Sequence, residues 1–296
     1  MIALQTYPEF QPNTEGVFWS LPAEIYHRAP GISQSALKNF EQSPAHYAWR
    51  KDHALEPTPA MRFGTLAHTA ILEPHLLDSL VIAPDRPRPS KKQINAKKPA
   101  PETVELIDFW KRWDAENSGK IAVSEEDRVK LFGVRDAVMN HPIARKALDT
   151  DIRECSVFVK FNLGGSVLRK LRIDAVRGNA LVDVKTIENA LTFEAQAFDL
   201  RYYRQAAFYL DGWNDAHPND KKDAFVFIAV EKEPPHGVIV YEIDAEALGR
   251  GREEYINLLV KFIECEATNT WPNYSPEIRK LSLPRWARPK TEAIRF

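Results

Sequence analysis

Leu171-Arg-Ile-Asp-Ala-Val-Arg-Gly-Asn-Ala-Leu-Val-Asp-Val-Lys-Thr186 is the stretch that decides the fold we expect for this chain. Two short apolar runs flank Gly178-Asn179, and such a dipeptide between strand-like residues is typical of a two-residue hairpin turn. If the chain turns there, Asp174 lies directly opposite Asp183 on the same face, with Cβ atoms about 4.5–5.5 Å apart. The stretch therefore predicts a hairpin that brings two carboxylates together.

The charged face of this hairpin has two interpretations. Opposed carboxylates repel one another unless a cation lies between them, and oxygen ligands suit a hard divalent ion such as Mg²⁺. Lys185 lies two residues from Asp183 and so shares its face, opposite Arg172. The alternative is an exposed strand face that carries its charges into solvent. The other face is apolar in both interpretations and consists of Ile173, Ala175, Val182 and Val184.

The composition is that of a globular protein without a global basic field. The chain has 296 residues, enough for a sizeable core, and its formal net charge is −1, so contacts with nucleic acid have to come from local basic patches. Its two cysteines, Cys155 and Cys265, are too few for a four-cysteine iron–sulfur or zinc site. The N-terminus lacks a secretion-signal pattern, and no long apolar run predicts a membrane span. We therefore expect a cytoplasmic protein.

Helices are predicted before the hairpin, and strands on both sides of it. Serine caps at Ser33 or Ser35 predict one helix, and a second helix over 61–72 carries His68. A single helical histidine is more often structural than a metal ligand, unless the fold brings it to the hairpin. A strand over 155–161, which Glu154 begins, makes the hairpin the second half of a three-stranded meander. Two more strands are predicted over 224–230 and 238–243, and a last helix over 245–266.

A helical segment over 193–213 follows the hairpin directly. Arg201, Gln205 and Tyr209 recur every four residues in it and so line one face. A polar stripe of this kind is usually solvated. Because it follows the strand that bears Asp183 and Lys185, contact with a substrate is the alternative.

The composition changes between Pro84 and Pro101. This segment holds six basic residues, one acid and five prolines, so it cannot bury a core and we expect a mobile loop. It is either a solvated linker or a basic arm near a phosphate backbone. Amphipathic helices follow it, one of them with a capping-box-like start at Ser124-Glu-Glu-Asp127. We expect one domain over 1–296, with a basic loop and helical insertion over 84–150 and an irregular tail over 271–296.

The pattern Asp174 … Asp183-Val-Lys185 resembles the D…(D/E)xK core of the restriction-endonuclease-like, or PD-(D/E)XK, nucleases. Further motifs are similar to those of the RecE (exonuclease VIII) nuclease-domain family, a RecB-like branch: Ser33-Gln-Ser-Ala-Leu-Lys-Asn-Phe40, Phe63-Gly-Thr-Leu-Ala-His68 and Arg204-Gln-Ala-Ala-Phe-Tyr209. The resemblance extends from about residue 20 to Pro284-Arg-Trp286. It implies an α/β fold with a central mixed β-sheet, in which an antiparallel three-stranded meander is flanked by helices.

The resemblance also implies roles for individual residues. It makes Lys185 the catalytic lysine. Gln205 and Tyr209 match the helix motif that orients the catalytic site and DNA, and Glu154 is a secondary candidate. The implied ion is Mg²⁺, with Mn²⁺ able to replace it. The implied metal ligands are His68, Asp174, Asp183 and the backbone carbonyl of Val184.

The activity implied by the resemblance is a Mg²⁺-dependent DNA exonuclease. It would digest one strand of linear duplex DNA from the 5′ end and leave 3′ single-stranded tails for recombination. Its implied partners are linear duplex ends, a single-strand annealing protein, and further copies of the chain in a ring around DNA. The alternatives are an endonuclease or single-strand nuclease on the same core, and a non-catalytic DNA-binding scaffold, against which the intact Asp174, Asp183 and Lys185 argue. A glycosidase would also use two carboxylates but leaves Lys185, Gln205 and His68 unexplained.

Overall fold

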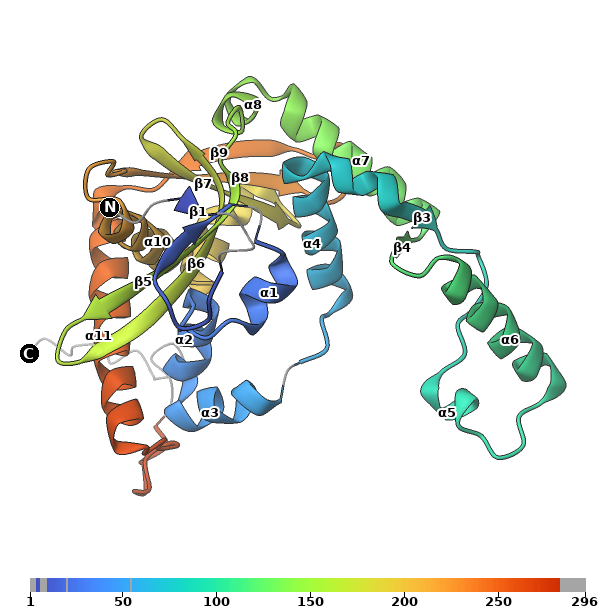
Figure 1. Cartoon of the computed structure of the whole chain (residues 1–296), viewed down its shortest axis with the longest axis horizontal. Helices are drawn as coiled ribbons and strands as arrows, with labels where there is room; N and C mark the ends of the chain where they lie inside the picture. Colours follow the sequence, from blue (N-terminus) through green and yellow to red (C-terminus); the bar gives the residue numbers. More distant parts are fainter. Residues whose placement is uncertain (1–3, 6–9, 20, 54, 283–296) are drawn as a thin grey trace, which may run out of the picture.

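The computed structural model describes residues 4–5, 10–19, 21–53 and 55–282 (Figure 1). The motif at Pro284-Arg-Trp286 and the end of the predicted tail over 271–296 lie outside the described residues. The strands are β1 (Leu4–Gln5), β2 (Gly16–Phe18), β3 (Leu80–Ile82), β4 (Ile121–Val123), β5 (Arg153–Asn162), β6 (Ser166–Arg177), β7 (Ala180–Ile187), β8 (Ala224–Glu231) and β9 (Val238–Glu242). The α-helices are α1 (Ala23–Arg28), α2 (Gln34–Gln42), α3 (Pro44–Asp52), α4 (Pro59–Leu72), α5 (Lys91–Ile94), α6 (Pro101–Glu116), α7 (Glu125–Asn140), α8 (Pro142–Ala147), α9 (Phe193–Asp199), α10 (Tyr202–Ala216) and α11 (Ala245–Thr268), and the 3₁₀ helices include η2 (Pro74–Ser79) and η3 (Ala190–Thr192).

A mixed sheet forms the centre of the protein. Its strand order is β1-β2-β5-β6-β7-β8-β9. The consecutive strands β5, β6 and β7 pair antiparallel, while β7 and β8 pair parallel. The predicted α/β class, the mixed sheet and the antiparallel meander are therefore confirmed.

Two apolar cores attach helices to this sheet. One contains residues of α2, α10 and α11, and the other contains residues of α4 and α7 (Figure 1). The four residues predicted for the apolar hairpin face are each at most 1% exposed, but they do not share one face, because Ile173 packs in the first core and the other three pack in the second. Asp174 and Asp183, at 7% and 3% exposure, are buried as well. The interpretation of the hairpin as a charged face open to solvent is therefore wrong, and both carboxylates lie where burial disfavours charge.

Local signals predicted the helix starts, but not every helix. Ser33 caps α2 by accepting from the backbone N–H of Ala36, and Ser124 caps α7 in the same way. The single helical segment predicted over 193–213 is wrong, because Arg201 adopts a left-handed conformation (φ 63°) between α9 and α10. The expectation of a structureless loop over 84–101 is also incomplete, since a capping box at Ser90 starts the short helix α5 there. Among the described residues, no helix is both long and apolar enough for a membrane span.

Candidate active site

The hairpin of β6 and β7 has the register that its turn predicts. Ala175 pairs with Val182, Val176 with Leu181 and Arg177 with Ala180. Beyond the first of these pairs the two strands part. There the backbone N–H of Val184 donates to Oδ2 of Asp174 at 2.7 Å. The Asp174 carboxylate thus stands at the opening between the strands.

Asp183 contacts the amide group of Gln205 and the ammonium group of Lys185. Its Oδ1 accepts a hydrogen bond from Nε2 of Gln205 on α10 at 2.6 Å. Its Oδ2 lies 2.6 Å from Nζ of Lys185, as an ion pair, but no group in the described part of the chain gives this buried oxygen a hydrogen bond. A carboxylate oxygen has two lone pairs, so the contact with Lys185 leaves one of them for another cation.

Lys185 remains a cation in this environment. Burial lowers its pKa, but the Asp183 carboxylate opposes that effect, and the pKa ends above its usual value. The ammonium also lies 4.7 Å from the ring centre of Tyr202 at the start of α10. Lys185 is therefore placed to donate hydrogen bonds and to stabilise negative charge, rather than to accept a proton.

Three possible metal ligands converge beside this pair. One ligand atom each from His68, Glu154 and Asp174 lie within 4.8 Å of one another. His68 comes from α4, and its Nδ1 lies 3.4 Å from Oδ2 of Asp174. Burial lowers the pKa of His68, although Asp183 opposes the shift, so the ring is neutral and can bind a metal. The fold thus brings to the hairpin a histidine that lies more than one hundred residues away in sequence.

Glu154 reaches this cluster through an irregular backbone. Its φ is 50°, between the regular pairs that Arg153 and Cys155 form with β6. Such a conformation costs a non-glycine residue about 1–3 kcal/mol and persists only where the surroundings enforce it. Arg172 forms an ion pair with Glu154 and also donates to the backbone oxygen of Leu21 at 2.6 Å. The expected position of Arg172 opposite Lys185 is therefore wrong, because Arg172 faces β5 and fixes Glu154.

The charges of this cluster favour a bound cation. Burial, with the carboxylates of Asp183 and Glu154, raises the pKa of Asp174 well above its usual value. A divalent cation held by His68, Glu154 and Asp174 would remove this repulsion, and Asp183, which does not belong to this group of close ligand atoms, stays a predicted ligand. Carboxylate oxygens with a single imidazole nitrogen are a donor set that suits hard or borderline divalent ions. The residues present therefore fit a divalent metal. The carbonyl oxygen of Val184 stays a predicted metal ligand. The structure shows in addition that the backbone N–H of Val184 donates a hydrogen bond to Asp174.

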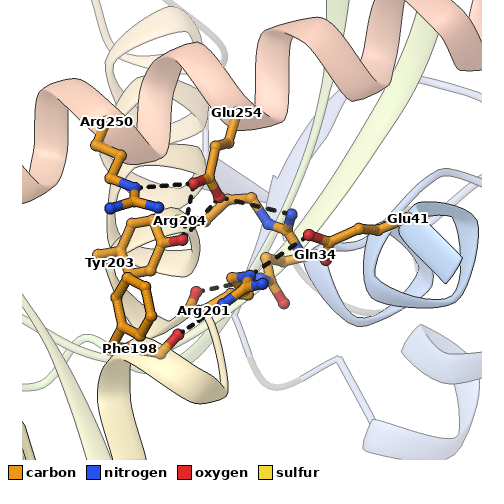
Figure 2. A network of polar contacts seen from close by, with 8 residues as sticks. All are labelled: Gln34, Glu41, Phe198, Arg201, Tyr203, Arg204, Arg250 and Glu254. Carbon is orange, nitrogen blue, oxygen red and sulfur yellow. Dashed lines mark hydrogen bonds and ion pairs between the residues drawn. The ribbon is translucent and has the colours of Figure 1, made fainter. Parts of the chain in front are cut away.

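A network of ion pairs fixes the start of α10, and with it Gln205 (Figure 2). Arg204 is 1% exposed and binds Oε2 of Glu41 on α2 at 2.9 Å. On its other side, Arg204 lies 3.8 Å from Glu254 of α11. Gln34 donates to the backbone oxygen of Arg201 at 3.3 Å, where the chain breaks between α9 and α10. The Arg201 side chain pairs with Glu41 instead. The prediction that Arg201 lines one helix face together with Gln205 and Tyr209 is therefore wrong.

A cavity of about 470 Å³ adjoins Gln205 and Tyr209. It is lined by the N-terminal end of α2, including Ser33, and by Lys170 and Arg172 of β6. Lys170 donates to three backbone oxygens, of which that of Ala29 is nearest at 2.6 Å, and has no carboxylate partner among the described residues. The cavity therefore has cationic walls. Burial raises the pKa of Tyr209 well above its usual value, so its hydroxyl stays protonated.

Lys170 is a site residue that the sequence analysis missed, and Arg172 was placed on the charged face but without its contact with Glu154. A signal for them existed, because Lys170, Arg172 and Asp174 alternate along a strand and so share a face. The residues that were predicted lie together around Asp174 and Asp183: His68, Glu154, Val184, Lys185 and Gln205, with Tyr209 at the adjoining cavity.

A mixed sheet whose central hairpin carries an aspartate and, on the next strand, an Asp-x-Lys sequence defines the class of PD-(D/E)XK-like domains. The chain belongs to the family described as a PDDEXK-like domain of unknown function (DUF3799), whose model matches residues 33–283. No curated protein matches the chain.

A solved structure shares this fold at low sequence identity. The crystal structure of a "putative exonuclease" from Eubacterium rectale aligns with a TM-score of 0.57 and 13% identity, over 90% of this chain and 96% of that chain. The crystal structure of SSO0001 aligns at 15% identity over 66% of this chain and 85% of that chain, with a TM-score of 0.27.

Proposed function

We propose that the protein is a Mg²⁺-dependent deoxyribonuclease that degrades linear duplex DNA from the 5′ end and leaves 3′ single-stranded tails. The observation that carries this proposal is the convergence of His68, Glu154 and Asp174 beside the Asp183–Lys185 ion pair. Membership of a PDDEXK-like family and the likeness to a protein described as an exonuclease support it.

Mg²⁺ is the ion we infer, with Mn²⁺ able to replace it, because most of the ligand atoms are oxygens. His68, Glu154, Asp174 and Asp183 would hold it. When bound there, the ion neutralises charge on the phosphate and acidifies water for attack.

The remaining chemistry falls to side chains of the chain itself. The Lys185 ammonium donates to the attacking water or to a phosphate oxygen, where negative charge grows in the transition state. Gln205 holds Asp183 in place through its 2.6 Å hydrogen bond, and Arg172 holds Glu154. Both act as positioning residues, since their contacts are with carboxylates rather than with a phosphate.

The cationic cavity beside Gln205 and Tyr209 supports an exonuclease rather than an endonuclease. The N-terminal end of α2 and the positive charges of Lys170 and Arg172 favour a phosphate group, although the three N–H groups of the Lys170 ammonium already donate to backbone oxygens. A phosphate held next to the metal site fixes the distance between a DNA end and the bond that is cut. This arrangement supports the inferred 5′ polarity and the resemblance to the RecE branch.

End-labelled linear duplex tests the proposal. With Mg²⁺ we expect mononucleotides released from 5′ ends, no product in EDTA, and no cutting of covalently closed circular DNA. Cutting of closed circles at a comparable rate would favour an endonuclease, and preference for single strands a single-strand nuclease. Binding of duplex without any hydrolysis would favour the non-catalytic scaffold.

The proposed activity also predicts partners. A 3′ tail needs a single-strand annealing protein, and a ring of several copies would keep the enzyme on its substrate. Cross-linking followed by mass determination, with and without duplex ends, tests the ring. Co-purification with a single-strand annealing protein tests the partner. Cell fractionation tests the expected cytoplasmic location.

A further inference from the structure

A helical arm extends from the body of the protein (Figure 1). It comprises residues 83–120, which we call the arm, and contains α5 and α6. Its two ends meet in the parallel pair of β3 and β4, where Leu80 lies opposite Ile121. None of its described residues belongs to the buried cores of the sheet or of the N-terminal segment. The arm therefore adds nothing to the main core, and its surface is available for another purpose.

The arm has its own fixed structure. Trp110 of α6 is 4% exposed, and its Nε1 donates to the backbone oxygen of Pro87 at 3.0 Å. Arg88 stacks 4.0 Å from the centre of the Trp110 ring and forms two hydrogen bonds, of 3.0 and 2.8 Å, with Asp114. The loop before α5 is thus tied to α6. At about 1.5 Å per residue, the 16 residues of α6 extend the arm by about 24 Å.

The charge of the arm is concentrated in its loop. Residues 86–98 contain six basic residues and no acid, so the rest of the chain carries a formal charge of −7. Arg88 is the one of these six that pairs with an acid in the described part of the chain. The other five include four exposed lysines on or beside α5, namely Lys91, Lys92, Lys97 and Lys98. Unpaired lysines on a rigid support are an electrostatic footprint for a polyanion.

The position of the arm relates it to the candidate active site. The chain runs from α4, which carries His68, through η2 into β3 and the arm. It returns through β4 into α7, which packs beside α4 (Figure 1). The arm is therefore fixed to the same helices that frame the site, and a polyanion bound to it would keep a defined place relative to the metal ligands.

We propose that the arm binds the phosphate backbone of duplex DNA away from the cleavage site, through the lysines of residues 91–98. This inference rests on the proposed nuclease function, which it deepens by naming where the uncut duplex lies. Lysines act as point charges on phosphates and read no base sequence, so the contact is independent of sequence. A backbone rise of about 3.4 Å per base pair means that an arm of this length spans about seven base pairs.

Salt-dependent binding tests the arm separately from catalysis. Affinity for a 30-base-pair duplex is measured in EDTA, where no hydrolysis occurs, at several salt concentrations. A triple variant carries Lys92→Gln, Lys97→Gln and Lys98→Gln. Its matched control carries Lys160→Gln, Lys221→Gln and Lys261→Gln, which are also exposed lysines but lie outside the arm. Thermal melting of both variants checks that they are folded.

We expect the arm variant to bind the duplex about tenfold more weakly than the wild type. Each lost phosphate contact makes the slope of log K against log salt concentration less steep by about 0.9, so three substitutions should reduce the slope by about 2–3. The control variant keeps the slope of the wild type. Hydrolysis of bis(p-nitrophenyl) phosphate, which is too small to reach the arm, stays unchanged in both variants.

An unchanged slope in the arm variant, or an equal loss in the control, overturns the arm proposal and leaves the nuclease proposal intact. If the substitutions weaken binding of an acidic protein but not of DNA, the arm proposal is also overturned and the nuclease proposal stays intact. A wild-type protein that binds duplex through the arm but hydrolyses nothing with Mg²⁺ overturns the nuclease proposal alone.

Discussion

The Asp183→Asn variant tests the site most directly, because it keeps the shape of the side chain and removes its charge. An asparagine can still accept the hydrogen bond that Gln205 now donates to Oδ1. Its amide NH₂ would then face the Lys185 ammonium, which now lies 2.6 Å from Oδ2. The variant thus replaces an ion pair by two facing donors, and it removes the free carboxylate lone pair that we assign to the metal.

The effect on stability is the sum of opposing terms. Leaving a buried charge without its partner costs about 3–5 kcal/mol. The Asp174 carboxylate also acts on Lys185, however, and its repulsion with Asp183 is lost in the variant. We expect a net cost of about 1–2 kcal/mol, which lowers Tm by about 2–4 °C in a chain of this size. The variant should therefore fold, with a normal circular dichroism spectrum at 25 °C.

The effect on activity should be far larger. We expect kcat for Mg²⁺-dependent hydrolysis of linear duplex to fall at least about 10³-fold, or about 4 kcal/mol, because a charged metal ligand is lost. Mg²⁺ at about 100 times its Kd should stabilise the wild type by about 2.7 kcal/mol, a gain of about 5 °C that the variant lacks. The exposed Asp78→Asn serves as control. A folded Asp183→Asn protein with more than a tenth of the wild-type activity would refute the assignment.

Four further outcomes are expected. Lys185→Met should lower kcat by at least about 10²-fold but keep the Mg²⁺-dependent gain in Tm; loss of that gain would mean that Lys185 acts through the metal site instead. Because the pKa of Asp174 is raised in the metal-free protein, protons compete with the metal for this carboxyl group at pH values above its usual pKa, so Mg²⁺ affinity should rise with pH there and calorimetry in different buffers should detect proton release. For the same reason the metal-free fold should lose stability as pH rises from the unfolded pKa of this group towards its folded pKa, and Asp174→Asn should abolish that trend; a trend that persists in the variant contradicts the reasoning. Arg172→Lys keeps a cation beside Glu154 but loses the planar fork, so we expect Mg²⁺ affinity about 10–100-fold lower with an unchanged fold, whereas unchanged affinity would show that Arg172 does not position Glu154.

The sequence was sufficient for the features that depend on neighbouring residues. Gly178-Asn179 determined the turn, and the turn determined the register of β6 and β7, since a pleated strand alternates its faces every residue. Serine caps marked the starts of α2 and α7 because a cap needs only its own first turn. The direct opposition of Asp174 and Asp183 was wrong, because the ladder between β6 and β7 ends at Ala175 and Val182, although the two carboxylates still lie close enough to interact at the opening of the hairpin.

Only the tertiary structure decided the contacts between distant segments. The left-handed backbone of Arg201 separates two helices that local propensity would join, and that of Glu154 departs from strand geometry within β5; surrounding contacts enforce both. Arg172 pairs with Glu154, rather than standing opposite Lys185, because β6 has neighbours on both sides and the sequence pattern does not say which one a long side chain reaches. His68 joins the site because α4 packs against the same hairpin. Short-range spacing fixes which face a residue occupies, whereas the partner that it meets there depends on how helices and strands far apart in the chain pack together.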